Sequence, residues 1–172
     1  MAYSPYRGWY KLTNPNKFVR PLDETMQSTK ITNDGLYIQY KSLLERKMFV
    51  YADLNPKVKH FSIEPFPIEY IKPTDNKVHR YYIDVFIEFT NGSKVFVEIK
   101  PYCETVIPPK TSNSDKYKKR LITYMINQAK WKSAKEFAKN KGCEFVVITE
   151  KELKWLVFAF VIKDMKNELI TL

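Results

Sequence analysis

The sequence predicts one α/β domain with a mixed central β-sheet flanked by helices. Its 172 residues, 44% of them hydrophobic and 15% aromatic, are enough chain for one well-buried core. Two runs of β-branched and aromatic residues flank Asn91-Gly92, which is the strongest short-range signal for a β-hairpin. Apolar residues recur with helical spacing both before and after this hairpin, and a short apolar run follows at Glu144 to Thr149. The order of elements is therefore helix, strand pair, helix, strand.

Residues 1–35 are rich in proline, polar and aromatic residues, and we expect them to form an irregular N-terminal arm. Interleaved aromatic and basic side chains suit a nucleic-acid strand. Aromatic residues in a terminal segment more often dock it on the core, and we favour that interpretation. The residues concerned are Tyr3, Tyr6, Arg7, Trp9, Tyr10 and Lys11.

A helix is predicted from about Asp34 to Leu54, because apolar residues recur there at three- and four-residue spacing until Pro56 ends the pattern. Glu45 lies at the edge of this apolar stripe. Its own surroundings favour a weak ion pair with a neighbouring basic residue. The stripe consists of Tyr37, Tyr40, Leu44, Met48 and Tyr51.

The segment 61–71 alternates apolar and polar residues and contains two prolines, so we expect an edge or bulged strand. Glu64 is a candidate auxiliary acid, although a solvent-facing position is the preferred interpretation. Arg80 stands just before the hairpin and is a candidate phosphate ligand, with a surface ion pair as an equal alternative.

The hairpin spans Tyr81 to Pro101, and its core faces follow from the alternation of side chains along a strand. A three-residue loop with Gly92 in the left-handed conformation would place Asp84 opposite Glu98, whereas a two-residue loop would place it opposite Ile99. We predict the three-residue loop. The expected core residues are Ile83, Val85, Ile87, Phe89, Val95, Val97 and Ile99.

Asp84, Glu98 and Lys100 then share the opposite face of the hairpin. Neighbouring carboxylates raise each other's pKa, and a divalent cation removes that conflict. Asp84 and Glu98 form a plausible Mg²⁺ ligand pair, and Lys100 could activate a bound water or neutralise phosphate charge. For the hairpin considered alone, a solvated face with cross-strand ion pairs is the favoured alternative.

After a linker at 103–113, a second helix is expected to begin at Ser114-Asp115. Its apolar positions indicate packing on the sheet, with a break near Asn127 as an alternative. They are Tyr117, Leu121, Tyr124 and Met125, followed by Trp131, Ala134 and Ala138. The following Gly142 suits a helix C-cap. A buried strand is expected over Glu144 to Thr149.

This second helix region is strongly basic, with ten Lys or Arg between residues 110 and 141 against only Asp115 and Glu136. Together with the formal net charge of +10, this predicts contact with a phosphate backbone. No recognition-helix or finger motif indicates base readout. The expected DNA-contacting residues, all facing outward, are Lys116, Lys118, Lys119, Arg120, Lys130, Lys132 and Lys135, with Lys139 beside them.

The remaining features exclude other classes. The longest apolar run, Trp155 to Ile162, is too short to span a bilayer and reads as a strand or a buried helix segment. Without a signal-peptide core, a soluble intracellular protein is expected. Cys103 and Cys143 show no zinc or disulfide pattern.

The spacing from Asp84 to Glu98-Ile99-Lys100 resembles the signature of the PD-(D/E)XK nuclease superfamily. The wider sequence is similar to the head-completion nucleases of T-even-like tailed phages, which in turn resemble the transposon endonuclease subunit TnsA. This resemblance covers residues 1–152. It is carried by the opening Met-Ala-Tyr-Ser, Leu44-Glu45-Arg46, Asn55-Pro56, Arg80 to Asp84, Glu98 to Pro101, Lys130-Trp131-Lys132 and Ile148-Thr149-Glu150.

The resemblance implies a metal-dependent DNA endonuclease with a restriction-endonuclease-like core at residues 36–152 and a C-terminal extension, 153–172, packed on it. Asp84, Glu98 and the Ile99 carbonyl would hold Mg²⁺ or Mn²⁺. Lys100 would be catalytic, and Glu45 would complete the set of acids. The chain departs from the superfamily pattern at Ile83, where a proline is nominal.

It also implies a setting in phage assembly, with double-stranded DNA as substrate, including ends and branched forms. Portal and head-completion proteins would be partners, and no membrane is involved. The expected location is the host cytoplasm during assembly, with the virion as a second possibility. Two alternatives stay open: a non-catalytic head-completion or DNA-end-binding protein, and a branched-DNA resolvase or repair nuclease of the same fold.

Overall fold

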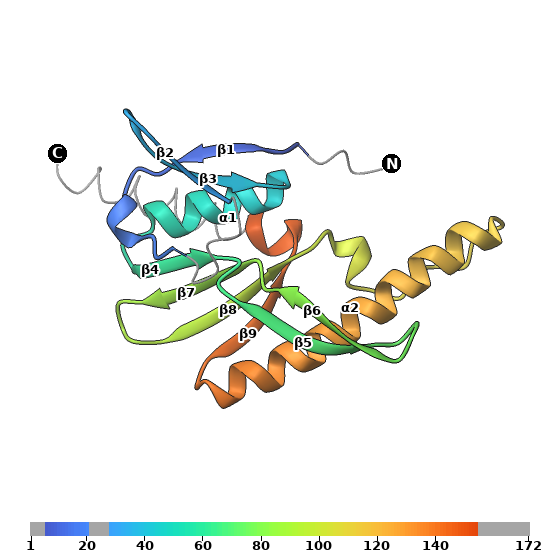
Figure 1. The fold of residues 1–172 in the computed structure, drawn as a ribbon. Coiled ribbons are helices and arrows are strands. Elements are labelled where there is room, and N and C mark those ends of the chain that lie inside the picture. Colours follow the sequence, from blue (N-terminus) through green and yellow to red (C-terminus); the bar gives the residue numbers. More distant parts are fainter. Residues whose placement is uncertain (1–5, 21–27, 155–172) are drawn as a thin grey trace.

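A mixed four-stranded sheet lies at the centre of the computed structural model, which describes residues 6–20 and 28–154. Helix α1 covers one face of this sheet and helix α2 the other, and a small three-stranded sheet lies on the far side of α1 (Figure 1). The predicted α/β class with a mixed sheet is confirmed. The central strands, in order across the sheet, are β4 (Val58–Ile63), β7 (Val85–Phe89), β8 (Lys94–Ile99) and β9 (Glu144–Ile148), of which only the β8–β9 pair is parallel.

The hairpin loop between β7 and β8 has the predicted three-residue form. The backbone N–H of Phe89 donates to the Ser93 carbonyl at 2.8 Å, and that of Gly92 donates to the Phe89 carbonyl at 3.0 Å. Gly92 adopts a φ of +84°, in the left-handed region that favours glycine. The resulting register pairs Val85 with Val97, as expected.

Both faces of this hairpin are buried, which the sequence did not predict. One apolar cluster lies between the sheet and α1 (Leu43–Leu54), and a second lies between the sheet and α2 (Ser114–Asn140). Ile83 belongs to the second cluster rather than sharing a face with Val85, because the chain bends at Ile83 and Asp84. That bend separates β7 from the preceding strand, β6 (Lys77–Tyr82).

The segment predicted as one edge strand at 61–71 is divided between two sheets. Its first part ends β4, at the edge of the central sheet, and its second part is β5 (Pro67–Lys72), which pairs with β6. Pro65 lies between them, where a residue without a backbone N–H does least harm. The β5–β6 hairpin packs on α2 through Ile68, Tyr70 and Tyr81.

The N-terminal region forms a regular sheet, so the prediction of an irregular arm is wrong for the described residues. Its three antiparallel strands have the order β1–β3–β2. The expected helix start at Asp34 is also wrong, because Leu36, Ile38 and Tyr40 fit a period of two as well as a helical period. The elements are β1 (Gly8–Lys11), a 3-10 turn at Pro15–Lys17, β2 (Thr29–Thr32) and β3 (Gly35–Tyr40).

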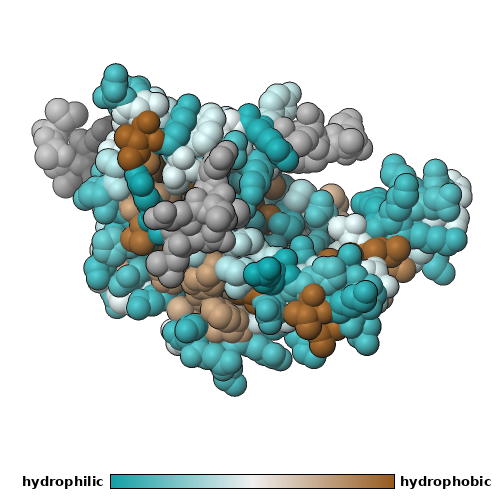
Figure 2. All heavy atoms as spheres, viewed as in Figure 1, coloured by the Kyte–Doolittle hydropathy of each residue, from teal (hydrophilic) through white to brown (hydrophobic). Residues whose placement is uncertain are grey.

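Helix α2 begins at Ser114 as predicted, where the Asn113 side chain accepts a hydrogen bond from the Lys116 N–H. It is one continuous helix of 27 residues, so there is no break near Asn127. Its first half projects beyond the body of the molecule (Figure 1) and is covered mainly by hydrophilic side chains (Figure 2). The predicted packing of its apolar residues therefore fails for Met125, which is exposed, and holds for the C-terminal half.

The chain leaves α2 through Gly142 (φ +65°) and enters β9, as the predicted cap and strand required. The strand is not fully buried as predicted, because it lies at the edge of the sheet: Glu144 is exposed and the next four residues are partly buried. A short 3-10 turn, Tyr102–Glu104, lies in the linker between β8 and α2. The expectation for Trp155 to Ile162 lies outside the described residues. None of the described helices combines the length and apolar character needed to cross a membrane.

Candidate active site

The bend before β7 and the end of β8 bring Asp84, Glu98 and Lys100 together, as the predicted register required. The Lys100 ammonium nitrogen lies 3.0 Å from Glu98 Oε1 and 3.6 Å from Asp84 Oδ2. It also donates to the Ile99 carbonyl at 3.2 Å. Three oxygen atoms from the three predicted metal ligands therefore surround one cationic nitrogen.

Asp84 is held in place by the strand opposite. Its Oδ2 accepts a hydrogen bond from the backbone N–H of Ile99 at 2.7 Å, and its carbonyl accepts one from the Glu64 N–H at 3.1 Å. These bonds tie the bend at Asp84 to β8 on one side and to the end of β4 on the other. The carboxylate position is thus fixed by backbone groups rather than by flexible side chains.

Glu98 is only 2% exposed, and the cost of burying its charge raises its pKa to about 7. Repulsion from Asp84 adds to this rise, and the neighbouring Lys100 opposes it. Burial alone would lower the pKa of Lys100, but the two carboxylates outweigh burial and raise it. The lysine therefore stays charged, and the cluster attracts positive charge.

Glu98 Oε2 is buried and has no hydrogen-bond partner among the described residues, and the same is true of the buried indole N–H of Trp131 on α2. Trp131 nevertheless lies close enough to Glu98 to lower its pKa slightly. The unpaired oxygen is an acceptor without a donor, in a place where an unsatisfied buried group is costly. Such an atom fits a site that receives a cation.

Lys130 was predicted to face outward, and the structure places it at the site instead. Its ammonium lies 5.4 Å from the ring centre of Tyr81 and 5.7 Å from that of Tyr70. The Tyr81 hydroxyl donates to the Lys130 carbonyl at 3.0 Å. Burial lowers the pKa of Lys130, while attraction to Glu98 opposes that change.

Glu45 caps its own helix and also reaches the site. Its carboxylate accepts from the Lys41 N–H at 2.7 Å and from the Ser42 hydroxyl at 3.2 Å, while Ser42 accepts from the Glu45 N–H. Burial raises the pKa of Glu45, and repulsion from Asp84 adds to the rise. The capping bonds were not predicted, although Ser42 three residues before Glu45 is their sequence signal.

Glu45 and Asp84 line a small pocket together with Glu64, the predicted auxiliary acid. The pocket volume of about 20 Å³ is enough for one water molecule or ion. Glu64 forms an ion pair with Lys41 and adopts a φ of +44°, a strained value for a non-glycine residue. The remaining lining residues are Gln39, Phe49 and Ile63.

The acids do not form a closed metal cage. Across residues 6–20 and 28–154, no three His, Cys, Asp or Glu side chains are grouped so as to hold an ion by themselves. The available ligands are two carboxylates and one backbone carbonyl, which are hard oxygen donors of the kind that Mg²⁺ prefers. The unpaired Glu98 Oε2 and the ammonium enclosed by these oxygens indicate that the donor set fits a cation.

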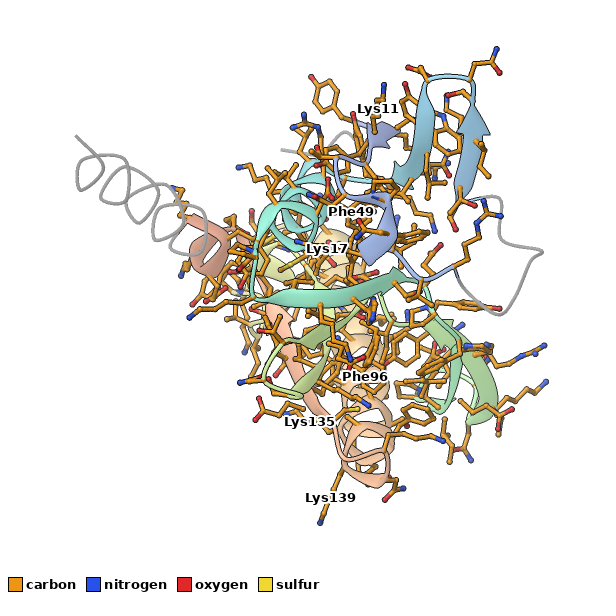
Figure 3. All side chains as sticks on the ribbon, turned by 90° about the vertical axis from the view of Figure 1, so that its left-hand side faces the viewer. Lys11, Lys17, Phe49, Phe96, Lys135 and Lys139 are labelled. Carbon is orange, nitrogen blue, oxygen red and sulfur yellow. The ribbon has the colours of Figure 1, made fainter. Side chains whose placement is uncertain are left out.

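The other predicted DNA-contacting residues are spread along α2. Lys116, Lys118 and Lys119 are exposed on its projecting half, and Arg120 is half-buried. Lys132 and Lys135 are exposed on the half that packs on the sheet, and Lys139, near the end of that half, points away from the body (Figure 3). Arg80 is exposed on β6 opposite Glu69, and no hydrogen bond or ion pair within the described residues joins it to the acids.

Comparison with known proteins identifies the family to which the chain belongs. The family model for the N-terminal domain of TnsA-like endonucleases matches residues 55–150, which hold Asp84, Glu98 and Lys100. The chain belongs to the TnsA-like endonuclease family. Its fold is accordingly the restriction-endonuclease-like core that the resemblance implied. Glu45 lies outside the matched range.

Similarity to a phage protein covers more of the chain. The head completion nuclease of Enterobacteria phage T4 is 31% identical over 135 residues, which cover 76% of this chain and 90% of that protein. The recognised resemblance to phage head-completion nucleases is thus confirmed. The chain is a TnsA-like endonuclease related to a head-completion nuclease.

Proposed function

We propose that this chain is a metal-dependent DNA endonuclease that acts in phage head completion after DNA packaging. The observation that carries the proposal is the convergence of Asp84, Glu98 and the Ile99 carbonyl on one cationic nitrogen. Buried acids in such a cluster are costly for the fold, and a bound cation offsets that cost. The relationship to a head completion nuclease supports the biological setting.

In this proposal Asp84, Glu98 and the Ile99 carbonyl hold Mg²⁺ or Mn²⁺. When bound, the ion polarises a phosphoryl oxygen and lowers the pKa of an attacking water. Lys100, whose ammonium lies 3.0 Å from Glu98 Oε1 and 3.6 Å from Asp84 Oδ2, would orient the attacking water or stabilise negative charge on the phosphate. Glu45 orients water in the adjacent pocket.

Lys130 is the proposed contact to the phosphate next to the cleaved bond. Its ammonium is fixed by two aromatic rings, and within the described residues it forms no ion pair with an acid. A cation held by rings keeps its charge available for a phosphate. The exposed lysines of α2 are the proposed contacts to the DNA backbone farther along, and double-stranded DNA is the proposed substrate.

The proposed partners are portal and head-completion proteins, and the proposed location is the host cytoplasm during assembly, with the virion as a second location. This part of the proposal rests on the relationship to the phage protein. Fold alone does not select it over junction resolution. Substrate preference is therefore part of the test.

The test incubates linear, supercoiled and branched DNA with wild type and Glu98→Ala in Mg²⁺, Mn²⁺ and EDTA. Glu88→Ala is the matched control, because Glu88 is a partly exposed acid of β7 that pairs with Lys59 at 3.2 Å, away from the cluster. Metal-dependent cleavage that is lost in Glu98→Ala and kept in Glu88→Ala is expected. Cleavage in EDTA, or full activity of Glu98→Ala, would refute the proposal. Salt-sensitive binding without cleavage would indicate a DNA-end-binding protein, and a preference for branched DNA would indicate a resolvase.

A further inference from the structure

The small N-terminal sheet presents two chemically different faces. Tyr10 and Ile38 point inward to α1, where the Tyr10 hydroxyl donates to Asp53 at 2.7 Å. The alternate positions Trp9, Lys30 and Tyr37 lie on the outer face. The docking that the sequence favoured therefore applies to one face of β1, and the other face remains open to solvent.

On the outer face, Asp34 pairs with Lys11 at 3.2 Å and accepts a hydrogen bond from the Tyr37 hydroxyl at 2.7 Å, whereas Lys30 has no acidic partner among the described residues. The Lys30 ammonium lies 4.7 Å from the ring centre of Trp9 and 4.9 Å from that of Tyr37, and it forms no ion pair within the described residues. Trp9 is 37% exposed and Tyr6, just before β1, is 66% exposed. Aromatic rings interleaved with cations are the chemistry by which proteins hold unpaired bases and their phosphates.

This face leads directly to the candidate active site. Along β3, Gln39 follows Tyr37 on the same side, and Lys41 comes two residues later. Gln39 and Lys41 both line the pocket that contains Asp84. At about 3.3 Å per residue, Tyr37 and Lys41 are about 13 Å apart along the chain. Lys11, on the same outer face, lies on the side of the sheet away from Phe49 of α1 (Figure 3).

We propose that the outer face of the β1–β3–β2 sheet binds a single-stranded segment of the DNA substrate and leads it to the pocket at Asp84. Lys30 contacts a phosphate, and Trp9 stacks on a base. A base inside a duplex is covered on both faces by its neighbours, so stacking on Trp9 requires an unpaired strand. This inference rests on the proposed nuclease function, because it names the form of DNA which that site would receive.

Binding in EDTA separates this inference from catalysis. The probes are an oligothymidine of about 15 nucleotides and a blunt duplex of equal length, with affinity measured by fluorescence anisotropy. The variants are Lys30→Gln and Trp9→Leu, and the control is Lys94→Gln, an exposed lysine at the start of β8. Thermal unfolding shows whether each variant is folded. If Trp9→Leu does not fold, Lys30→Gln still tests the proposal, because it changes an exposed side chain.

Each of the two variants should lose about tenfold in affinity for the oligothymidine, while its affinity for the duplex stays within about twofold of wild type. Lys94→Gln should bind both probes normally. Equal loss for the oligothymidine and the duplex would overturn the assignment to single strands, and unchanged binding by Lys30→Gln would overturn the surface altogether. Both outcomes are binding results in EDTA, and they are independent of whether Glu98→Ala loses metal-dependent cleavage. The single-strand proposal can therefore fail while the nuclease proposal stands.

Discussion

Asp53 and Glu98 are both buried carboxylates, with exposed fractions of 0% and 2%, yet their surroundings differ. Asp53, at the end of α1, accepts hydrogen bonds from the Tyr10 hydroxyl at 2.7 Å and from the Thr13 and Asn14 N–H groups at 2.7 and 2.8 Å. Glu98 pairs with the Lys100 ammonium, and its second oxygen has no hydrogen-bond partner within residues 6–20 and 28–154. The first acid fastens the N-terminal segment to α1.

The difference teaches that burial of an acid does not by itself indicate a functional site. A carboxylate whose oxygens are satisfied by fixed donors is part of the structure, because its charge is already compensated. A buried carboxylate beside another acid, with an oxygen unpaired, lowers the stability of the fold and is retained for another reason. Four predictions test this distinction.

The largest expected difference is in catalysis. Glu98→Gln keeps the shape of the side chain but removes its charge, and it should lower DNA cleavage on the order of a thousandfold or more. Asp53→Asn should keep near-normal cleavage per folded molecule, measured well below its unfolding temperature. A comparable loss of cleavage in both variants would abolish the distinction.

The next effect is on stability at Asp53. Replacing the carboxylate by an amide sets an NH₂ group against N–H and O–H donors, so Asp53→Asn should lower the free energy of unfolding by about 4 kcal/mol. Urea unfolding measures this difference. A loss below about 1 kcal/mol would show that the N-terminal segment does not depend on Asp53.

Glu98→Gln should have the opposite effect on stability in the absence of metal. The folded pKa of about 7 lies above the ordinary value of 4.5, so the folded state binds the proton more tightly and wild-type stability falls as pH rises between these values. At pH 8 the variant should therefore be more stable by about 2 kcal/mol. Below pH 4.5 the advantage should disappear. A variant less stable than wild type at pH 8 would show that Glu98 is well compensated.

The smallest effect concerns metal binding. Mg²⁺ at about ten times its dissociation constant should stabilise wild type by about 1.4 kcal/mol and leave Glu98→Gln nearly unchanged. Thermal unfolding with and without Mg²⁺ provides the measurement, and Asp53→Asn should respond as wild type does. If Mg²⁺ stabilised wild type and Glu98→Gln equally, the ion would not be bound by Glu98.

The hairpin and its acids were predictable because their signals are local. Asn91-Gly92 locates the turn, and the choice of a three-residue loop then gives the register that pairs Val85 with Val97 and brings Asp84 to Glu98. The helix start was not predictable from the same kind of evidence, because the apolar residues of β3 fit two periods equally well. Only the Asp34-Gly35 turn signal opposed a helix there.

The contacts from α2 to the site were beyond sequence reasoning for a different reason. Lys130 and Trp131 approach Glu98 only because α2 crosses the sheet at one particular angle, which is a tertiary property. Their neighbouring lysines, such as Lys132, are exposed as predicted. The basic composition therefore indicated a charged helix but could not show which lysine faces the acids.

The projecting half of α2 gives one helix two very different local stabilities. Lys116 and Arg120 repel each other across one turn, and both oppose the helix dipole at the N-terminal end. This half has little apolar packing, and a helix of such length is marginal on its own. Amide hydrogens should therefore exchange with solvent quickly before Asn127 and slowly after it. Phosphate groups would remove this repulsion, so a bound polyanion should slow amide exchange in the first half of α2.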